Sequence, residues 1–368
     1  MSKKKISIII NTSWNIYNFR KGLVNAFLAE GWEVHAIAPE DEYSKRLTNM
    51  GCIFHPIQVD NKGSNPIKDL QTTLSFRKIL KEIKPDISLH YTVKPNIYAT
   101  LAARTLGIPV ISNISGLGTI FIRQNFISKI GITLYKLALK HPKVVFFQNP
   151  DDKTLFLKKK IIKETQAKLL AGSGIDTNYF TPFYKENNHL SFLMVARLIY
   201  DKGILEYYAS AKKIKKESPN VTFNICGFIE PESQLGVDKK TVEKWQKEGV
   251  INYLGTTDDI KSIINQHQII VLPSYREGTP KTLLEAAATA KPIITTDVPG
   301  CREVVKDGIN GYLCEAKSID DLAEKIKKMI KTSPESRQKM GEKGRELVLN
   351  KFDQRFVIET YITEIEKI

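Results

Sequence analysis

The feature that most constrains the fold is a regular alternation of short apolar runs with longer amphipathic segments. In the first half, amphipathic stretches such as residues 18–30 and 70–83 lie between the runs. The alternation predicts a parallel sheet covered by helices on both faces. The runs that we expect to be its buried strands are residues 6–10, 34–38, 87–90, 110–114 and 144–148.

The same pattern starts again in the second half of the chain. Helices are expected at residues 205–217 and 281–288, and strands at residues 190–196, 222–227, 251–254, 269–273, 292–295 and 311–314. A chain of 368 residues is also too long for one ordinary core, since domains average about 150 residues. We therefore predict an α/β protein with two doubly wound, Rossmann-like domains.

The domain boundary is expected in the polar segment 178–190. This gives an N-terminal domain of residues 1–182 and a C-terminal domain of residues 183–351, with a last helix at about 352–368 packing back on the first domain. Ligands of such sheets bind at the carboxyl ends of the strands, so a cleft between two facing domains is the expected site.

Basic residues are concentrated in the first half of the chain. Residues 1–180 hold 26 Lys and Arg against 13 Asp and Glu, a net +13, whereas the rest holds 29 against 27, a net +2. This imbalance predicts an anionic partner for the first domain: a membrane surface, a phosphorylated lipid or nucleic acid. Nucleic acid is disfavoured because the basic half lacks a helix-turn-helix or aromatic-platform signature.

The remaining composition indicates a cytoplasmic protein. The four cysteines form no C-x-x-C pair and match no zinc-site spacing, so they are expected to be reduced core thiols. The short apolar run near the start ends at Asn11 without a cleavage site, and no stretch of about 18 apolar residues occurs. We expect neither a signal peptide nor a membrane span.

The most informative segment is LPSYREGTPKTLLEA at residues 272–286. A strand ends at Pro273, a loop carries Glu277 and Gly278, and a helix starts near Pro280. The free amides of a helix N-terminus favour phosphate, and a glutamate in front of them can accept hydrogen bonds from sugar hydroxyls. Glu285 follows on the helix, where apolar neighbours suggest a wall of the cleft.

A second segment, FLMVARLIYDKG at residues 192–203, leads a strand into Arg197 and then Lys202. Two cations at a strand exit suit a diphosphate. When a nucleotide-activated sugar is transferred, negative charge grows on the departing diphosphate, and fixed cations there lower the barrier.

These two segments together resemble the retaining GT-B glycosyltransferases of family 4. The arginine–lysine pair and the seven residues between Glu277 and Glu285 carry the resemblance. The segments FQNPDD (147–152), GSGID (172–176), PSYREG (273–278) and TDVPGCRE (296–303) are similar to a bacterial branch that builds capsules, O-antigens and other polyprenyl-diphosphate-linked glycans.

The resemblance implies a retaining transferase and a role for each donor-site residue. Arg197 and Lys202 would hold the diphosphate, Glu277 the donor sugar and Glu285 the ribose hydroxyls. The phosphate end would lie at Gly278, Thr279 and Pro280, and the base pocket would run from Gly255 to Ile260. Uracil is the expected base, with N-acetylhexosamine or N-acetylfucosamine as the sugar and a polyprenyl-diphosphate-linked sugar as the acceptor.

No D-x-D sequence occurs in the chain. That spacing holds a divalent ion in other glycosyltransferases, so we expect no metal and no cofactor here, with Arg197 and Lys202 supplying the positive charge.

The first domain would hold the acceptor. Its first strand-end loop, residues 11–20, lacks the Gly-Gly pair common in the family and is aromatic and amide-rich instead. Trp14 and Tyr17 could stack on a sugar while Arg20 meets an acceptor phosphate, or the aromatic rings could simply pack against the next helix.

Residues 89–96 follow the fourth predicted strand, where many family members have a histidine near the anomeric carbon of the donor. His90 could fill that place, or it could be a core histidine on the buried side of the strand. Lys94 is the rival candidate in the same loop.

Residues 120–143 combine recurring apolar residues with spaced Lys and Arg, a pattern typical of a helix that lies on anionic lipid. We therefore expect peripheral attachment to the inner leaflet of the cytoplasmic membrane. The alternative for this segment is a core helix with solvated lysines. For the protein as a whole, the alternatives are a nucleotide-sugar epimerase and a transferase with a soluble acceptor.

Overall fold

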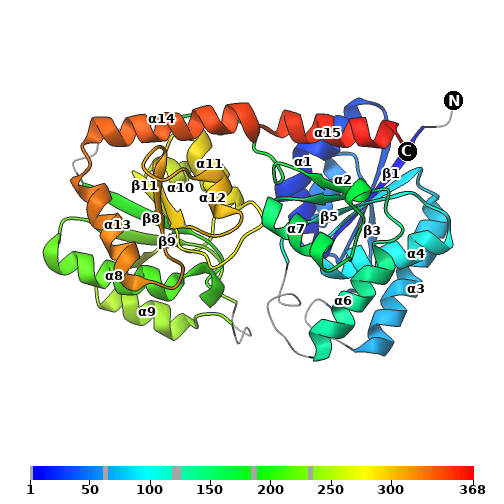
Figure 1. The fold of residues 1–368 in the computed structure, drawn as a ribbon, viewed down its shortest axis with the longest axis horizontal. Helices are drawn as coiled ribbons and strands as arrows, with labels where there is room; N and C mark the ends of the chain where they lie inside the picture. The colour runs from blue at the N-terminus through cyan, green and yellow to red at the C-terminus, as the bar shows by residue number, and fades with distance from the viewer. Residues whose placement is uncertain (1–2, 61–64, 118–125, 184–188, 231–234) are drawn as a thin grey trace. The chain divides into compact units, whose positions relative to one another are not determined.

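The computed structural model describes residues 3–60, 65–117, 126–183, 189–230 and 235–368. The chain divides into two compact units. Unit 1 comprises Met1–Ser173 and Gln354–Ile368, and unit 2 comprises Gly174–Asp353. Figure 1 shows the order of the elements along the chain.

Unit 1 is built on a parallel sheet whose strand order is β3-β2-β1-β4-β5-β6-β7. The strands are β1 (Lys5–Ile9), β2 (Glu33–Ala38), β3 (Ile53–Pro56), β4 (Ile87–Tyr91), β5 (Val110–Ile114), β6 (Val144–Phe147) and β7 (Ala167–Leu169). The central strand β4 is buried throughout, because helices cover both of its faces.

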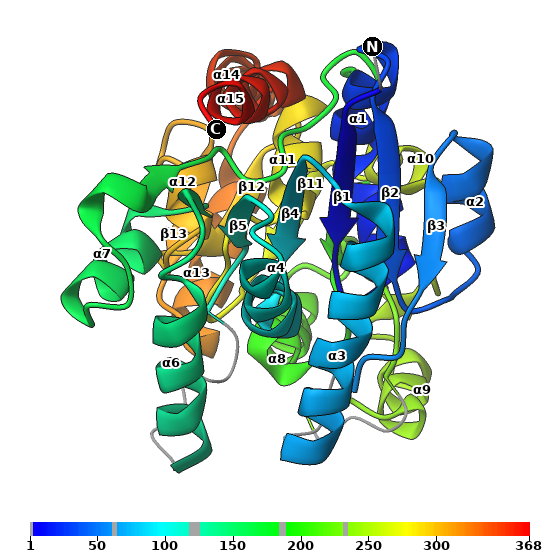
Figure 2. The same ribbon diagram turned by 90° about the vertical axis from the view of Figure 1, so that its right-hand side faces the viewer.

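The helices of unit 1 form two layers around this sheet. Contacts join α1 to α2 and α15 on one side, and α3 to η1 and α4, with α6 against η1, on the other. Figures 1 and 2 show α1 and α15 on one face and α3, α4 and α6 on the other. The helices are α1 (Ser13–Ala29), α2 (Ser44–Asn49), α3 (Pro66–Ile83), the π-helix η1 (Pro95–Ala99), α4 (Thr100–Thr105), α6 (Phe126–Ala138), α7 (Pro150–Lys158), η2 (Glu164–Gln166) and α15 (Gln354–Glu366).

Unit 2 repeats the architecture with strand order β10-β9-β8-β11-β12-β13, again parallel. Its strands are β8 (Ser191–Val195), β9 (Thr222–Cys226), β10 (Asn252–Tyr253), β11 (Ile269–Leu272), β12 (Ile293–Thr296) and β13 (Gly311–Cys314). The expectation of two Rossmann-like α/β domains is confirmed.

Helices again cover both faces of this second sheet. On one side α8 packs against α13, and on the other α11 packs against α14. The helices are η3 (Tyr200–Lys202), α8 (Ile204–Glu217), α9 (Lys239–Lys247), α10 (Ile260–Asn265), α11 (Lys281–Ala288), α12 (Cys301–Val304), α13 (Ile319–Lys331) and α14 (Pro334–Lys351).

The change from unit 1 to unit 2 lies at Ser173 and Gly174, nine residues before the boundary predicted after residue 182. The residues between are held by the end of unit 2: the Ile175 amide donates to the Phe352 carbonyl at 2.9 Å, and Arg345 donates to the Phe180 carbonyl at 2.8 Å. Part of the predicted boundary segment, residues 184–188, lies outside the described residues.

Candidate functional site

In unit 2, the loops that follow β8 and β11 are hydrogen-bonded to each other. The Tyr275 amide donates to the Asp201 carbonyl at 2.9 Å, and the Ser274 hydroxyl donates to the same oxygen at 3.1 Å. Gly203 follows η3 with φ +73°, and a Cβ there would lie 2.0 Å from the Pro273 carbonyl oxygen. Only glycine permits this close approach of the two loops.

Lys202 and Glu277 meet across this junction. The Lys202 ammonium donates to Glu277 Oε1, and the two side chains are 20% and 12% exposed. The Glu277 amide donates to the Pro299 carbonyl at 3.2 Å, so the loop after β12 fixes the backbone of the glutamate. Adjacent strand ends thus bring together two charged residues that are 75 positions apart in the sequence.

The helix α11 begins directly after this junction. Pro280 precedes it in an extended conformation, and Lys281 is its first residue. The predicted phosphate-end residues lie in the turn that enters the helix, with Thr279 only 8% exposed. The Thr282 hydroxyl donates to the Val195 carbonyl at 3.1 Å, which holds the helix start against the end of β8. The positive end of the helix dipole therefore lies beside the end of β8.

Glu285 is buried on the same helix, at 6% exposure. Burial raises the pKa of its carboxyl group, against the effect of Lys281, whose ammonium lies 3.7 Å from Glu285 Oε1. Most glutamates on helices are solvated or cap the helix, so a buried glutamate such as Glu285 is unusual.

Arg197 lies at the exit of β8 but, among the described residues, bonds to neither Lys202 nor Glu277. Its side chain is 60% exposed, and Nη1 donates to Glu230 Oε1 at 2.9 Å. The sequence analysis missed Glu230. The position of Glu230 could have indicated the contact, because residues 227–230 follow β9, the strand that neighbours β8. The carboxyl ends of neighbouring parallel strands lie side by side.

The two residues predicted at the base pocket lie after β10, at the same edge of the sheet. Gly255 has φ +73°, and its carbonyl accepts from the Gly227 amide at 2.8 Å. Ile260 is the first residue of α10. Both therefore follow the strand next to β9, whose own exit carries Glu230.

Trp14, Tyr17 and Arg20, which were predicted to bind the acceptor from a loop of unit 1, lie on the helix α1. Thr12 caps α1 by accepting from the Asn15 amide, so the helix starts at Ser13, five residues earlier than predicted. Trp14 is 44% exposed, while the Tyr17 ring packs against Tyr43 with their centroids 5.6 Å apart.

Arg20 requires a correction, because it does not reach the surface of unit 1. It is 5% exposed, its guanidinium lies 4.4 Å from the Tyr91 ring centroid, and Nη1 donates to the Phe19 carbonyl at 3.0 Å. In this conformation it cannot meet an acceptor phosphate.

His90 also requires a correction. It is fully buried in β4, with Nε2 bonded to the Ser88 hydroxyl and Nδ1 to the Thr100 hydroxyl, both at 2.7 Å. Both ring nitrogens are therefore occupied, which contradicts a role at the reaction centre and fits the alternative of a core histidine. Lys94 is likewise engaged, since its ammonium donates to Asp69 Oδ1 at 2.6 Å.

The buried His90 makes stability depend on pH. Burial lowers its pKa to about 3, below the value of about 6.5 expected in the unfolded chain. Its stabilising contribution is complete above pH 6.5 and is lost as the pH falls toward 3. We therefore expect His90 to lower the free energy of unfolding of the wild-type protein by about 2 kcal/mol when the pH falls from 7 to 5.

The measurement is urea unfolding of wild type and His90→Gln at both pH values, with the exposed His189→Gln as control. Between pH 7 and pH 5, the free energy of unfolding of His90→Gln should fall by about 2 kcal/mol less than that of wild type, whatever its value at pH 7. Equal losses in wild type and His90→Gln would contradict the burial of a neutral imidazole.

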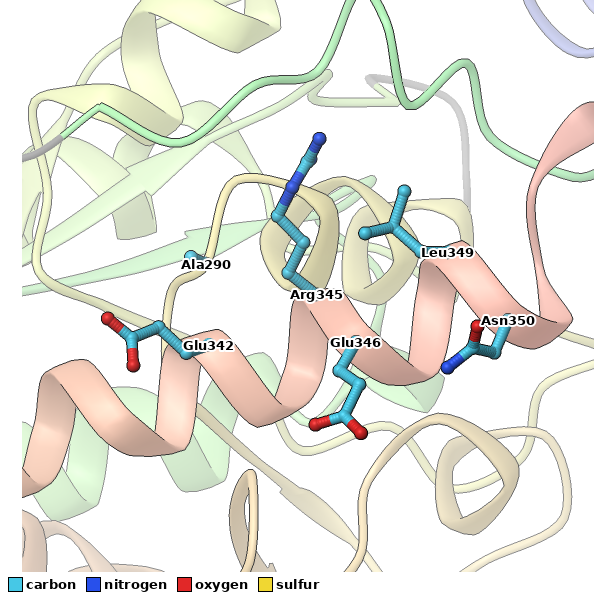
Figure 3. A pocket seen from close by; sticks show the side chains of 6 residues that line it. All are labelled: Ala290, Glu342, Arg345, Glu346, Leu349 and Asn350. Atoms are coloured by element: carbon cyan, nitrogen blue, oxygen red, sulfur yellow. The ribbon is translucent and has the colours of Figure 1, made fainter.

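A hollow of about 320 Å³ lies beside α14. Figure 3 shows its six lining residues: Ala290, Glu342, Arg345, Glu346, Leu349 and Asn350. Arg345 uses its guanidinium on the carbonyls of Thr177, Phe180 and Ala288. Arg345 therefore has a structural role, because its hydrogen bonds connect α14 to neighbouring segments of unit 2. None of the residues predicted to bind the donor lines this hollow.

The described residues contain no group of three or more His, Cys, Asp or Glu arranged to hold a metal ion. No described helix combines the length and the apolar composition that crossing a bilayer requires.

Curated relatives resemble the chain over most of its length. It is 28% identical over 344 residues, 89% of each chain, to the N,N'-diacetylbacillosaminyl-diphospho-undecaprenol alpha-1,3-N-acetylgalactosaminyltransferase of Campylobacter jejuni. It is 28% identical over 268 residues to the UDP-Gal:alpha-D-GlcNAc-diphosphoundecaprenol alpha-1,3-galactosyltransferase of Escherichia coli, covering 69% of this chain and 68% of that one.

Solved structures show the same fold at lower identity. Anabaena HepE in complex with UDP and glucose superposes with a TM-score of 0.80 at 14% identity over 100% of both chains. Two family models match the sequence: "Glycosyl transferases group 1" at residues 178–347 and "Glycosyl transferase 4-like" at residues 5–149. Because these models together match most of each unit, the chain belongs to the group 1 glycosyltransferases and has their GT-B fold of two Rossmann-like domains.

Proposed function

We propose that this glycosyltransferase moves a sugar, with retention of configuration, from a UDP-sugar to a polyprenyl-diphosphate-linked sugar during assembly of a surface polysaccharide. The C. jejuni and E. coli relatives are named for acceptors on undecaprenyl diphosphate, and a CapM of Staphylococcus aureus, 27% identical over 379 residues, is named for capsule biosynthesis. The donor sugar is proposed to be an N-acetylhexosamine or N-acetylfucosamine. Because the named relatives are transferases, the epimerase alternative is not favoured.

The observation that carries the proposal is the Lys202–Glu277 pair beside the start of α11. A diphosphate at that helix start would meet the positive end of the helix dipole and the Lys202 ammonium, with Arg197 at the same exit of β8 as Lys202. As the bond to the anomeric carbon breaks, charge grows on the diphosphate, and these fixed cations stabilise it. Glu277 is proposed to accept hydrogen bonds from the donor sugar, and Glu285 from the ribose.

Release of nucleoside diphosphate tests the proposal. UDP-N-acetylhexosamines and UDP-N-acetylfucosamine would be incubated with undecaprenyl-diphosphate-sugar analogues, and UDP and product mass would be followed. We expect UDP to be released only when an acceptor is present, and NMR of the product to show the anomeric configuration of the donor. Release that needs no acceptor, or an inverted product, would contradict the proposal.

The surface of unit 1 supports a peripheral position on the inner leaflet. In the described part of α6, the outward face carries exposed Ile130 and Leu137, at 47% and 45%, next to Lys129 and Lys136. The opposite face, with Tyr135 and Ala138, lies in the core. An apolar stripe bordered by lysines is the pattern of a helix that lies on anionic lipid.

Further cations of unit 1 gather in one place, two from the segment after α6 and one from α4. Lys140, Arg104 and Lys143 line a hollow of about 310 Å³ that has no acidic residue in its lining. They extend the positive face of unit 1 beyond the helix. Such a face attracts anionic headgroups, by about 1 kcal/mol for each lysine or arginine near the surface. Residues 120–125 of the predicted amphipathic segment lie outside the described residues.

A further inference from the structure

Within the described residues, the Arg197 side chain bonds only to a carboxylate. Its guanidinium donates to Glu230 Oε1 at 2.9 Å, and Glu230 is 21% exposed while Arg197 is 60% exposed. The proposed function assigns this same guanidinium to the donor diphosphate. A diphosphate oxygen and a glutamate oxygen are both anionic acceptors, so they compete for the same donor groups.

Backbone hydrogen bonds connect Leu198, next to Arg197, to described residues before and after Glu230. The Leu198 amide donates to the Phe228 carbonyl at 2.9 Å, and the Val237 amide donates to the Leu198 carbonyl at 2.9 Å. An isolated bridge also pairs Ile199 with Gly236. Phe228, Gly236 and Val237 are thus paired with the segment that follows Arg197, and Glu230 lies two residues beyond Phe228.

We propose that Glu230 is an internal competitor of the donor, an inference that rests on the proposed function of Arg197. Its carboxylate occupies Arg197 in the free enzyme and yields it when a diphosphate binds. Glu230 therefore weakens binding of every nucleoside diphosphate, including the product. A weaker hold on the product favours its release after transfer, so Glu230 is a positioning residue that sets affinity and contacts no reacting atom.

The size of the effect follows from the exposure of the pair. An ion pair at a largely exposed arginine is weak, so the carboxylate can be displaced without disrupting the fold. Replacing Glu230 by glutamine removes the competing charge and its repulsion of the diphosphate. We expect the affinity for a nucleoside diphosphate to rise about three- to tenfold in low salt.

The experiment is a double-mutant cycle read by calorimetry. The probe is whichever of UDP, dTDP, GDP and ADP the wild-type protein binds most tightly. Kd is measured for wild type, Glu230→Gln, Arg197→Gln and the double variant. Glu243→Gln is the matched control, because Glu243 is a half-exposed glutamate on α9 of the same unit and pairs with Lys239.

The outcomes separate the inference from the function beneath it. The inference holds if Glu230→Gln tightens binding three- to tenfold, Glu243→Gln does not, and most of the gain disappears in the Arg197→Gln background. If Glu230→Gln does not tighten nucleotide binding, or tightens it equally with and without Arg197, the inference is wrong. The proposed diphosphate site is not contradicted by either result. If Arg197→Gln binds the nucleotide as tightly as wild type, or wild type binds none, the proposed function fails first.

Discussion

Glu277→Gln is expected to lower kcat by about 10²- to 10³-fold while the protein stays folded. The carboxylate is 12% exposed and bonded to Lys202, so glutamine removes the charge that orients this ammonium and the strongest acceptor for a sugar hydroxyl. Both losses fall on the transition state, in which the sugar becomes cationic and the diphosphate gains charge. The effect therefore belongs mainly in kcat and less in KM.

The measurement is steady-state UDP release by wild type and Glu277→Gln, with thermal unfolding of both. The isosteric change keeps a hydrogen-bond acceptor for Lys202, so the unfolding free energy should fall by only about 1 kcal/mol. Glu243→Gln again serves as the control for loss of one glutamate charge in unit 2. An unchanged kcat in Glu277→Gln would reject its donor role.

Removing three charges from the α6 face is expected to weaken vesicle binding by about a hundredfold. The variant carries Lys129→Gln, Lys136→Gln and Lys140→Gln. Each lysine near an anionic surface contributes about 1 kcal/mol, and the three together amount to about two orders of magnitude in affinity. Exposed Ile130 and Leu137 remain in the variant, so the residual binding should depend little on salt.

The matched control removes three lysines from α9 of unit 2, as Lys240→Gln, Lys244→Gln and Lys247→Gln. These three side chains are exposed, and because each variant loses three lysines, the net charge changes equally in both. Co-sedimentation with vesicles of phosphatidylglycerol and phosphatidylethanolamine would be measured from low to physiological salt. Equal weakening in both variants would indicate a non-specific charge effect and would contradict the placement of α6 on the membrane.

Much of the fold could be predicted because buried parallel strands are short continuous apolar runs. Residues 110–114 and 311–314 were expected as strands, and the structure has β5 and β13 at the same positions. The strands that were missed lack this signal. β3 is a half-exposed edge strand, and β7 has only three residues at the opposite edge. Edge strands bury less, so their sequences are less constrained.

The candidate site could be predicted only as far as strand order determines proximity. Lys202 and Glu277 were assigned to one site from the sequence, and they meet because β8 and β11 are neighbours. The pairing of Arg197 with Glu230 depends on the direction of side chains beyond the strand ends, which sequence periodicity does not encode.

The side-chain directions of His90 and Arg20 could not be read from the sequence either. Every residue of β4 is buried, so no alternation of polar and apolar residues shows which way His90 points. Arg20 is buried among aromatic groups of unit 1, although arginine is a surface residue in most proteins.

The rate of UDP release in excess chelator tests the central claim most directly. If Lys202, Arg197 and the start of α11 neutralise the departing diphosphate, wild-type enzyme treated with EDTA should retain the rate it shows with Mg²⁺. Lys202→Gln should be slower by about 10²-fold or more under both conditions. Loss of wild-type activity in EDTA, restored by Mg²⁺, would contradict the account.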